Sequence, residues 1–267
     1  MVDINHNGKI SIAKDMIRIA KTAGCDFVKF QKRTVEKVYT QEYLNQPRES
    51  PWGQTNRDQK NALEFGEHEY DEIDLFCKLN EIGWFASPWD CDSVEFLKKY
   101  NPPYMKVASA CVTDMRLLEH IKTTEIPVIL STGMSTRDEV HKAVDFLSGQ
   151  IKYILACTST YPTPASELNL NFIRRLKAEF GTRYKIGYSN HSPGIQPCIS
   201  AATLGAEMIE FHITLDRSMY GSDQAASIET AGIFSLCKHL RDIPLEMGTG
   251  EWTVFESEQK IKQKLRK

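Results

Sequence analysis

No apolar run in the 267-residue sequence approaches the roughly 20 residues needed to cross a bilayer, and no segment resembles a signal peptide. The sequence also lacks an excess of positive charge, because 33 Lys and Arg residues face 35 Asp and Glu residues. The formal net charge of −2 argues against a protein that binds nucleic acid or a membrane. It leaves room for a local basic pocket that holds a phosphorylated metabolite.

Cysteine pairs of the CxxC type are missing as well. The seven cysteines are scattered, and a chain of this size can bury its own core, which predicts reduced thiols in the cytoplasm rather than a disulfide framework. The composition, with 41% apolar and 25% charged residues, is typical of a soluble globular protein. The chain length matches one α/β barrel of about 250 residues.

Short apolar runs alternate with amphipathic stretches, a pattern typical of a parallel sheet built from βα units. We expect eight strands, near Val2–Asn5, Phe27–Gln31, Trp84–Ser87, Tyr104–Ala108, Val128–Ser131, Tyr153–Ala156, Lys185–Tyr188 and Met208–His212. Their regular spacing predicts a (β/α)8 TIM barrel. The alternative is an open doubly wound sheet, but no GxGxxG motif follows the first strand, so its dinucleotide-binding version has no fingerprint.

The expected domain organisation is a barrel over residues 1–250 and a polar, Lys-rich tail over residues 251–267. A long polar insertion follows the second strand, at about residues 32–67. An insertion of this length is either a lid over a site or a surface excursion with a short helix. We expect the tail to form a solvated helix or a frayed end.

Polar residues follow the apolar runs, which is where a TIM barrel carries its catalytic groups. Lys29 and Lys106 lie inside apolar strands, where a lysine either meets an anion, loses its proton or extends its head to solvent. Hydroxyl groups occur at the same level, at Ser87, Ser109, Ser131, Thr132, Thr158, Ser159 and Ser189. Two cations with these hydroxyl groups predict a cradle for phosphate and carboxylate.

His191 and His212 each follow an apolar run, on strands that are neighbours in a barrel. Both imidazoles can therefore face one ion, and with Glu210 or Asp223 they suit Mn²⁺, Fe²⁺ or Zn²⁺. The alternative is that each histidine is a structural group with its hydrogen bonds satisfied.

Nine motifs, taken together and in their order along the chain, resemble those of a known family: INHNG, DFVKFQK, RESPWG, ASPWD, YMKVASA, ILSTGM, CTSTYPTP, IGYSNHSPG and IEFHIT. From Val2 to about Glu258, the chain resembles the N-acetylneuraminate (sialic acid) synthase family. The resemblance implies a (β/α)8 barrel that condenses phosphoenolpyruvate (PEP) with an open-chain N-acetylhexosamine, usually N-acetylmannosamine. The products are a nonulosonic acid and phosphate, and the reaction needs a divalent metal such as Mn²⁺ or Mg²⁺.

The resemblance assigns roles by motif. Lys29, Lys106 and Glu210 are the predicted catalytic residues, and His191 and His212 are the predicted metal ligands. The PEP-binding residues that the resemblance implies are Lys29, Lys106, Ser109, Ser131, Ser159 and Ser189, and the sugar-binding residues are Gln31, Tyr161 and Asp223. We add Ser87 to the PEP-binding set because its hydroxyl group occurs at the same level of the strands. We further expect a cytoplasmic homodimer whose partners are PEP and an amino sugar.

The chain departs from the family pattern in three places. Met1 stands where a pattern like EIGINHNG has a glutamate, and Cys111 stands where many members have an acidic residue. The sequence also ends where the family's small antifreeze-like domain begins. Two rival functions stay open: a class I aldolase that forms a Schiff base on Lys106 or Lys29, and a non-catalytic barrel that binds PEP or a sugar.

Overall fold

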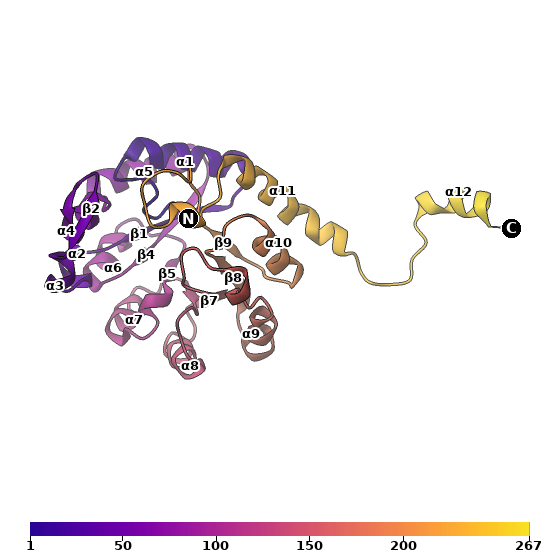
Figure 1. The fold of residues 1–267 in the computed structure, drawn as a ribbon. Coiled ribbons are helices and arrows are strands. Elements are labelled where there is room, and N and C mark those ends of the chain that lie inside the picture. The colour runs from indigo at the N-terminus through magenta and orange to yellow at the C-terminus, as the bar shows by residue number, and fades with distance from the viewer. Residues whose placement is uncertain (267) are drawn as a thin grey trace.

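The computed structural model describes residues 1–266 and contains a curled parallel sheet with helices packed on its outer side (Figure 1). Seven strands follow one another across the sheet in chain order: β1 (Phe27–Lys32), β4 (Gly83–Pro88), β5 (Met105–Val107), β6 (Val128–Ser131), β7 (Ile151–Cys157), β8 (Lys185–Asn190) and β9 (Ile209–Phe211). Each strand overlaps a segment predicted from the sequence. The α/β architecture is confirmed, because helices connect consecutive parallel strands as in βα units.

The expected first strand at Val2–Asn5 is wrong. Residues 3–8 form turns, with the backbone of Asp3, Asn7 and Gly8 in the left-handed region at φ of 40°, 50° and 69°. Only Met1 and Val2 occupy the place of a strand. The left-handed backbone at Asp3 ends the extended segment after Val2, and the turns that follow prevent a strand over Ile4 and Asn5.

These N-terminal residues bridge the two edges of the sheet, a join that we call the seam. The amino group of Met1 donates to the carbonyl of Phe211, and the Met1 carbonyl accepts from Ile213 N at 2.9 Å. On the other side, Val2 N donates to the carbonyl of Lys29 at 2.8 Å. Beneath the seam lies a cavity of about 790 Å³, bounded by parts of β1, β9 and the helices that cover them.

The outer helices are α1 (Ile10–Ala23), α5 (Glu67–Leu79), α6 (Cys91–Lys98), α7 (Met115–Lys122), α8 (Arg137–Phe146), α9 (Phe172–Phe180), α10 (Gln196–Thr203) and α11 (Thr230–Met247). Each buries one apolar stripe; in α1 the stripe contains Ala13, Met16, Ile17 and Ala20, at helical spacing. The main core lies between these stripes and the sheet. A smaller core of Phe85, Ile129 and Leu155 comes from side chains that alternate with those of the main core along the strands.

The insertion is folded rather than irregular. It consists of α2 (Val35–Val38), α3 (Gln41–Leu44), an antiparallel pair β2 (Pro47–Ser50) and β3 (Gly53–Thr55), and α4 (Asn56–Ala62). The hydroxyl of Tyr220, in the loop after β9, donates to the carbonyl of Glu49 at 2.9 Å, and its ring packs edge-on against Trp52. The insertion therefore packs against the loop that follows β9.

The C-terminal tail contains α12 (Glu256–Leu265), which lies apart from the curled sheet at the end of an extended segment (Figure 1). Its side chains are exposed along the whole helix, as is Trp252 before it. Lys267, the last residue of the expected tail, lies outside the described residues. Within residues 1–266, no helix is both long enough and apolar enough to cross a membrane.

Candidate functional site

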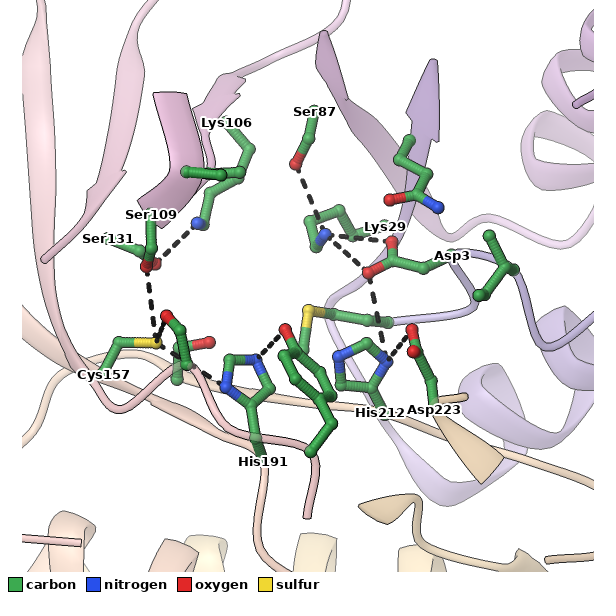
Figure 2. A pocket seen from close by; sticks show the side chains of 18 of the residues that line it. Asp3, Lys29, Ser87, Lys106, Ser109, Ser131, Cys157, His191, His212 and Asp223 are labelled. Carbon is green, nitrogen blue, oxygen red and sulfur yellow. Dashed lines mark hydrogen bonds and ion pairs between the residues drawn. The ribbon is translucent and has the colours of Figure 1, made fainter. Parts of the chain in front are cut away.

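A cavity of about 220 Å³ lies where the strands end at their carboxyl termini, which is the face where TIM-barrel enzymes carry their active sites. Every residue to which the sequence assigns a catalytic, PEP-binding, sugar-binding or metal-binding role lines it: Lys29, Gln31, Ser87, Lys106, Ser109, Ser131, Ser159, Tyr161, Ser189, His191, Glu210, His212 and Asp223. Thr132 and Thr158, whose hydroxyl groups were also expected in the cradle, are not among the lining residues. The strand order explains this convergence, because parallel strands bring their carboxyl ends to one edge. Figure 2 shows the side chains pointing toward one another.

Lys29 and Lys106 have similar surroundings. Lys29 Nζ lies 2.9 Å and 3.0 Å from the two carboxylate oxygens of Asp3 and 3.4 Å from Ser87 Oγ. Lys106 Nζ donates to Ser131 Oγ at 2.6 Å and lies 3.7 Å from Glu210 Oε1. Both lysines are buried, at 6% and 2% exposure, so neither extends its head to solvent.

The two lysines differ in their acid–base properties. Burial alone would lower the pKa of Lys29, but the carboxylates of Asp3 and Glu210 outweigh it and raise the pKa above its usual value. Burial lowers the pKa of Lys106, and Glu210 offsets only part of that effect. Lys29 is therefore the firmly cationic member of the pair.

Glu210 stands beside both lysines. Its Oε1 accepts from Ser189 Oγ at 2.7 Å, while its Oε2 is buried without a hydrogen-bond partner. Burial would raise the pKa of Glu210, but Lys106 and Lys29 outweigh it and lower the pKa below its usual range. The result is an ionised carboxylate with one oxygen free to accept a proton.

The two predicted metal-ligating histidines are close, with ring centroids 5.3 Å apart. His191 Nδ1 faces the carbonyl of Thr158 at 2.7 Å, and its Nε2 lies 2.8 Å from the hydroxyl of Tyr161. A carbonyl can only accept, so Nδ1 carries a proton, and Nε2, which pairs with Tyr161, is the nitrogen left for a metal. Metal ligation by His191 therefore requires Nε2 to exchange this partner. Burial would lower the pKa of His191, but the hydrogen bond to Cys157 and the carbonyl of Thr158 outweigh it and raise the pKa.

His212 is buried, and neither of its ring nitrogens has a hydrogen-bond partner. Its Nδ1 lies 3.6 Å from Asp223 Oδ2 and 4.0 Å from Asp3 Oδ2. Burial, together with the charge of His191, lowers the pKa of His212, so the ring is neutral. A neutral imidazole with unused nitrogens beside carboxylates fits a divalent cation. Within residues 1–266, however, no three His, Cys, Asp or Glu side chains already form a group arranged to hold one.

Gly133, from the ILSTGM motif, lets the hydroxyl groups converge. A Cβ atom at this position would lie 2.2 Å from Ser159 Oγ and 2.8 Å from Ser109 Oγ, so only glycine leaves room for both. Ser109 Oγ also accepts from Gly133 N at 3.1 Å. The motif thus shapes the cavity through its backbone.

The two cysteines near the site differ. Cys111 is buried in a short 3-10 helix and does not line the cavity, and burial raises the pKa of its thiol to about 12. It is a neutral packing group and supplies no acid or base. Cys157 does line the cavity, with its Sγ 3.7 Å from His191 Nδ1.

Sequence reasoning missed several charged residues of the cavity, namely Asp3, Arg33 and Lys60. Asp3 was hidden inside an expected strand, and the other two follow β1 or belong to the insertion. Burial and the nearby charges of Arg33 and Arg48 lower the pKa of Lys60 to about 8. The insertion therefore contributes to the site wall, as a lid would.

Comparison with known proteins identifies the family of this chain. Residues 16–252 match the model of the NeuB family. The N-acetylneuraminate-9-phosphate synthase of Mus musculus is 36% identical over 98% of this chain and 74% of its own length. The N,N'-diacetyllegionaminic acid synthase of Campylobacter jejuni is 34% identical over 96% of this chain and 79% of its own length.

Solved structures agree with these relatives. The N-acetylneuraminic acid synthetase of Leptospira borgpetersenii, in complex with citrate, superimposes with a TM-score of 0.85 at 28% identity, covering 100% of this chain and 90% of that one. A truncated 3-deoxy-D-arabino-heptulosonate 7-phosphate synthase of Thermotoga maritima shares the fold alone, with a TM-score of 0.68 at 13% identity, covering 93% of this chain and 87% of that one. The match over most of the chain, together with relatives above 30% identity, confirms that this chain is an enzyme of the NeuB family, a family of PEP-condensing synthases.

Proposed function

We propose that this enzyme condenses PEP with an N-acylated hexose, such as N-acetylmannosamine or a relative, to give a nonulosonic acid and phosphate. The observation that carries the proposal is the pair of buried lysines, each with one serine hydroxyl, beside two imidazoles in a single cavity. Two cations at this depth suit a substrate that carries both a phosphate and a carboxylate.

PEP would occupy the cradle around Lys29 and Lys106. Charge-assisted hydrogen bonds from the two ammonium groups are roughly twice as strong as neutral ones, so they would dominate the binding energy. The hydroxyl groups of Ser87, Ser109, Ser131, Ser159 and Ser189 would complete the donor set. Lys29, which keeps its charge, would carry the more persistent contact.

We propose His191 and His212 as the ligands of a divalent cation, Mn²⁺ or Mg²⁺. When bound, such a cation supplies Lewis acidity toward the aldehyde oxygen of the acceptor sugar. The chain's own groups then determine orientation: Gln31, Tyr161 and Asp223 line the same cavity and would face the sugar. Holding both substrates at one mouth converts the encounter into an oriented reaction.

The chemistry requires a carbon–carbon bond between the substrates and a carbon–oxygen bond to water to form, and the carbon–oxygen bond to phosphate to break. The methylene carbon of PEP attacks the aldehyde carbon, and water adds at C2 of the former PEP. Phosphate then leaves with its bridging oxygen. Glu210, ionised and with Oε2 free, would take the proton of the water, and a proton must also reach the former aldehyde oxygen, which becomes a hydroxyl group. Lys29 and Lys106 would stabilise the departing phosphate.

The decisive experiment is a phosphate-release screen with PEP, Mn²⁺ and a panel of aldoses that includes N-acetylmannosamine and diacetamido-trideoxyhexoses. We expect release with at least one N-acylated hexose and none without an acceptor. PEP binding with no release for any sugar would instead indicate a binding protein. The subunit count of the active form, which we propose to be a cytoplasmic homodimer, can be measured by light scattering during the same assay.

One observation favours a second candidate. A lysine whose pKa is lowered by burial, as for Lys106, is what a Schiff-base aldolase requires. Borohydride trapping with a keto acid would attach the substrate covalently to Lys106 in an aldolase. The proposed synthase forms no imine and would remain unmodified.

A further inference from the structure

Asp3 is the one acidic residue of the cavity that comes from the N-terminal turn. Its backbone is fixed to β1 at the very residue that its side chain contacts, because Val2 N and Asp3 N both donate to the carbonyl of Lys29, at 2.8 Å and 3.3 Å. Asp3 itself adopts φ of 40°, which costs a non-glycine residue some energy. The turn therefore aims one carboxylate at one lysine.

The carboxylate of Asp3 connects two parts of the site (Figure 2). Both of its oxygens lie within 3.0 Å of Lys29 Nζ, and its Oδ2 lies 4.0 Å from His212 Nδ1. Its side chain is 7% exposed, as is that of Lys29, so water does not screen the pair. Apart from Asp3, the only side chain within hydrogen-bond distance of Lys29 Nζ in residues 1–266 is Ser87, at 3.4 Å.

We propose that Asp3 is a positioning residue for PEP, which holds the Lys29 ammonium in the cavity so that the N–H on the side of Ser87, where the contact is long at 3.4 Å, is directed to the substrate. The inference rests on the proposed PEP-dependent function. Two effects of Asp3 oppose each other, since its negative charge also repels an anionic substrate. We expect the positioning effect to dominate, because both oxygens of Asp3 lie about 3 Å from Lys29 Nζ and the charge of the carboxylate is therefore largely compensated by the lysine.

The test is calorimetric titration of PEP into the full chain with Mn²⁺ and no acceptor. We expect Asp3→Asn, which keeps the side-chain volume, to weaken PEP binding by about tenfold, the size of one charge-assisted contact. Asp15→Asn is the matched control, since Asp15 also pairs with a cation, Arg18, but on the exposed face of α1. It should bind PEP like the original protein.

A double-mutant cycle separates positioning from a general effect on folding. If Asp3 acts through Lys29, Asp3→Asn should cause no further loss of PEP affinity in a Lys29→Met background. Steady-state kinetics should show a higher KM for PEP and an acceptor KM within about twofold of the original. Should Asp3→Asn fail to fold, Asp3→Gly takes its place, because glycine suits the φ of this position.

The outcomes distinguish the two hypotheses. An original protein that does not bind PEP overturns the proposed function itself. If the original protein binds PEP and Asp3→Asn binds it equally well or more tightly, only the role of Asp3 is wrong. Weaker Mn²⁺ binding with unchanged PEP binding would likewise overturn it, because Asp3 would then act on the metal.

Discussion

The hydroxyl of Tyr161 lies 2.8 Å from Nε2 of His191, the one nitrogen of that ring that does not face a backbone carbonyl. The two rings also lie close, tilted by 33° with centroids 4.1 Å apart, and Tyr161 meets His212 edge-on at 5.5 Å. The tyrosine hydroxyl thus pairs with Nε2, the nitrogen through which His191 would bind a cation. Tyr161, which we propose to bind the sugar, is therefore also in contact with a proposed metal ligand.

Replacing Tyr161 by phenylalanine should tighten Mn²⁺ binding. The hydrogen bond to Nε2 stabilises the metal-free state by about 1 kcal/mol, so its loss should lower the Mn²⁺ dissociation constant roughly fivefold. Electron paramagnetic resonance of free Mn²⁺ measures this without turnover, and His191→Ala serves as the control that loses binding. Weaker binding in Tyr161→Phe would mean that the hydroxyl supports the ion instead of competing with it.

Removing each histidine should have unequal effects on stability. His191→Ala breaks contacts to Thr158 and Tyr161, whereas His212→Ala breaks no hydrogen bond. We expect His191→Ala to lower the free energy of unfolding by about 1–2 kcal/mol more than His212→Ala does. Urea denaturation measures the difference, and both variants should lose metal-dependent turnover. Full activity of either variant after exhaustive chelation would show that the replaced histidine is not a metal ligand.

Lys106→Met should weaken PEP binding by about 1.5–3 kcal/mol, because a charge-assisted contact is lost. The variant also leaves Glu210 buried with a weaker set of counter-charges, which should raise the pKa of Glu210. We therefore expect the acidic limb of the pH–rate profile to move to higher pH, as measured by phosphate release at saturating PEP. An unchanged KM for PEP together with an unchanged profile would place Lys106 outside the reaction.

Folding stability should fall as the pH decreases below about 6.5. Burial lowers the pKa of His6 to about 3, so the folded protein keeps His6 neutral while the unfolded chain takes up a proton below 6.5. Each such group lowers the free energy of unfolding by about 1.4 kcal/mol for every pH unit below 6.5, down to its pKa in the folded protein. The buried His212, whose pKa is also lowered, contributes a loss of the same sign. His6→Phe, which can keep the stacking on Phe65 at 3.9 Å, should reduce the slope of unfolding free energy between pH 6 and pH 5. An equal slope in the variant would show that other groups titrate.

The insertion should control the acceptor sugar more than PEP. Tyr220 ties the loop before Asp223 to the insertion at Glu49 and Trp52. Tyr220→Ala should displace Asp223, and a misplacement of about 1 Å costs on the order of 10–100-fold, seen as a higher acceptor KM. Leu79→Ala, at an exposed position on α5, is the control. Equal changes in the KM of both substrates would show that the acceptor pocket is built elsewhere.

The strands that carry the site were predictable because each is a short β-branched or apolar run that ends in polar residues, as at Val128–Ser131. Parallel pairing then brings Lys29, Lys106, His191 and His212 to one edge without knowledge of any distance. The first strand was mispredicted because hydrophobicity at Val2 and Ile4 gives no information about the left-handed backbone at Asp3.

Other parts of the site depend on tertiary contacts that sequence spacing does not encode. Lys60 reaches the cavity because the insertion folds back over the sheet, and Asp3 reaches it because a turn replaces a strand. The pairing of Lys29 with Asp3, and of Lys106 with Glu210, follows from side-chain geometry. The motifs identify which residues belong to the site, but they do not predict which of these residues pair with one another.

The seam has a mechanical consequence for the active site. Between β9 and β1 the sheet is joined by the backbone of the first residues, while its other strands pair directly with one another. Asp3 and Lys29 belong to one flank of this join, and His212, which follows β9, belongs to the other. Any widening of the seam would lengthen the distance between Asp3 and His212 while leaving the ion pair with Lys29 intact. The spacing between the Lys29 ammonium and the imidazole of His212 therefore depends on the backbone hydrogen bonds of Met1 and Val2.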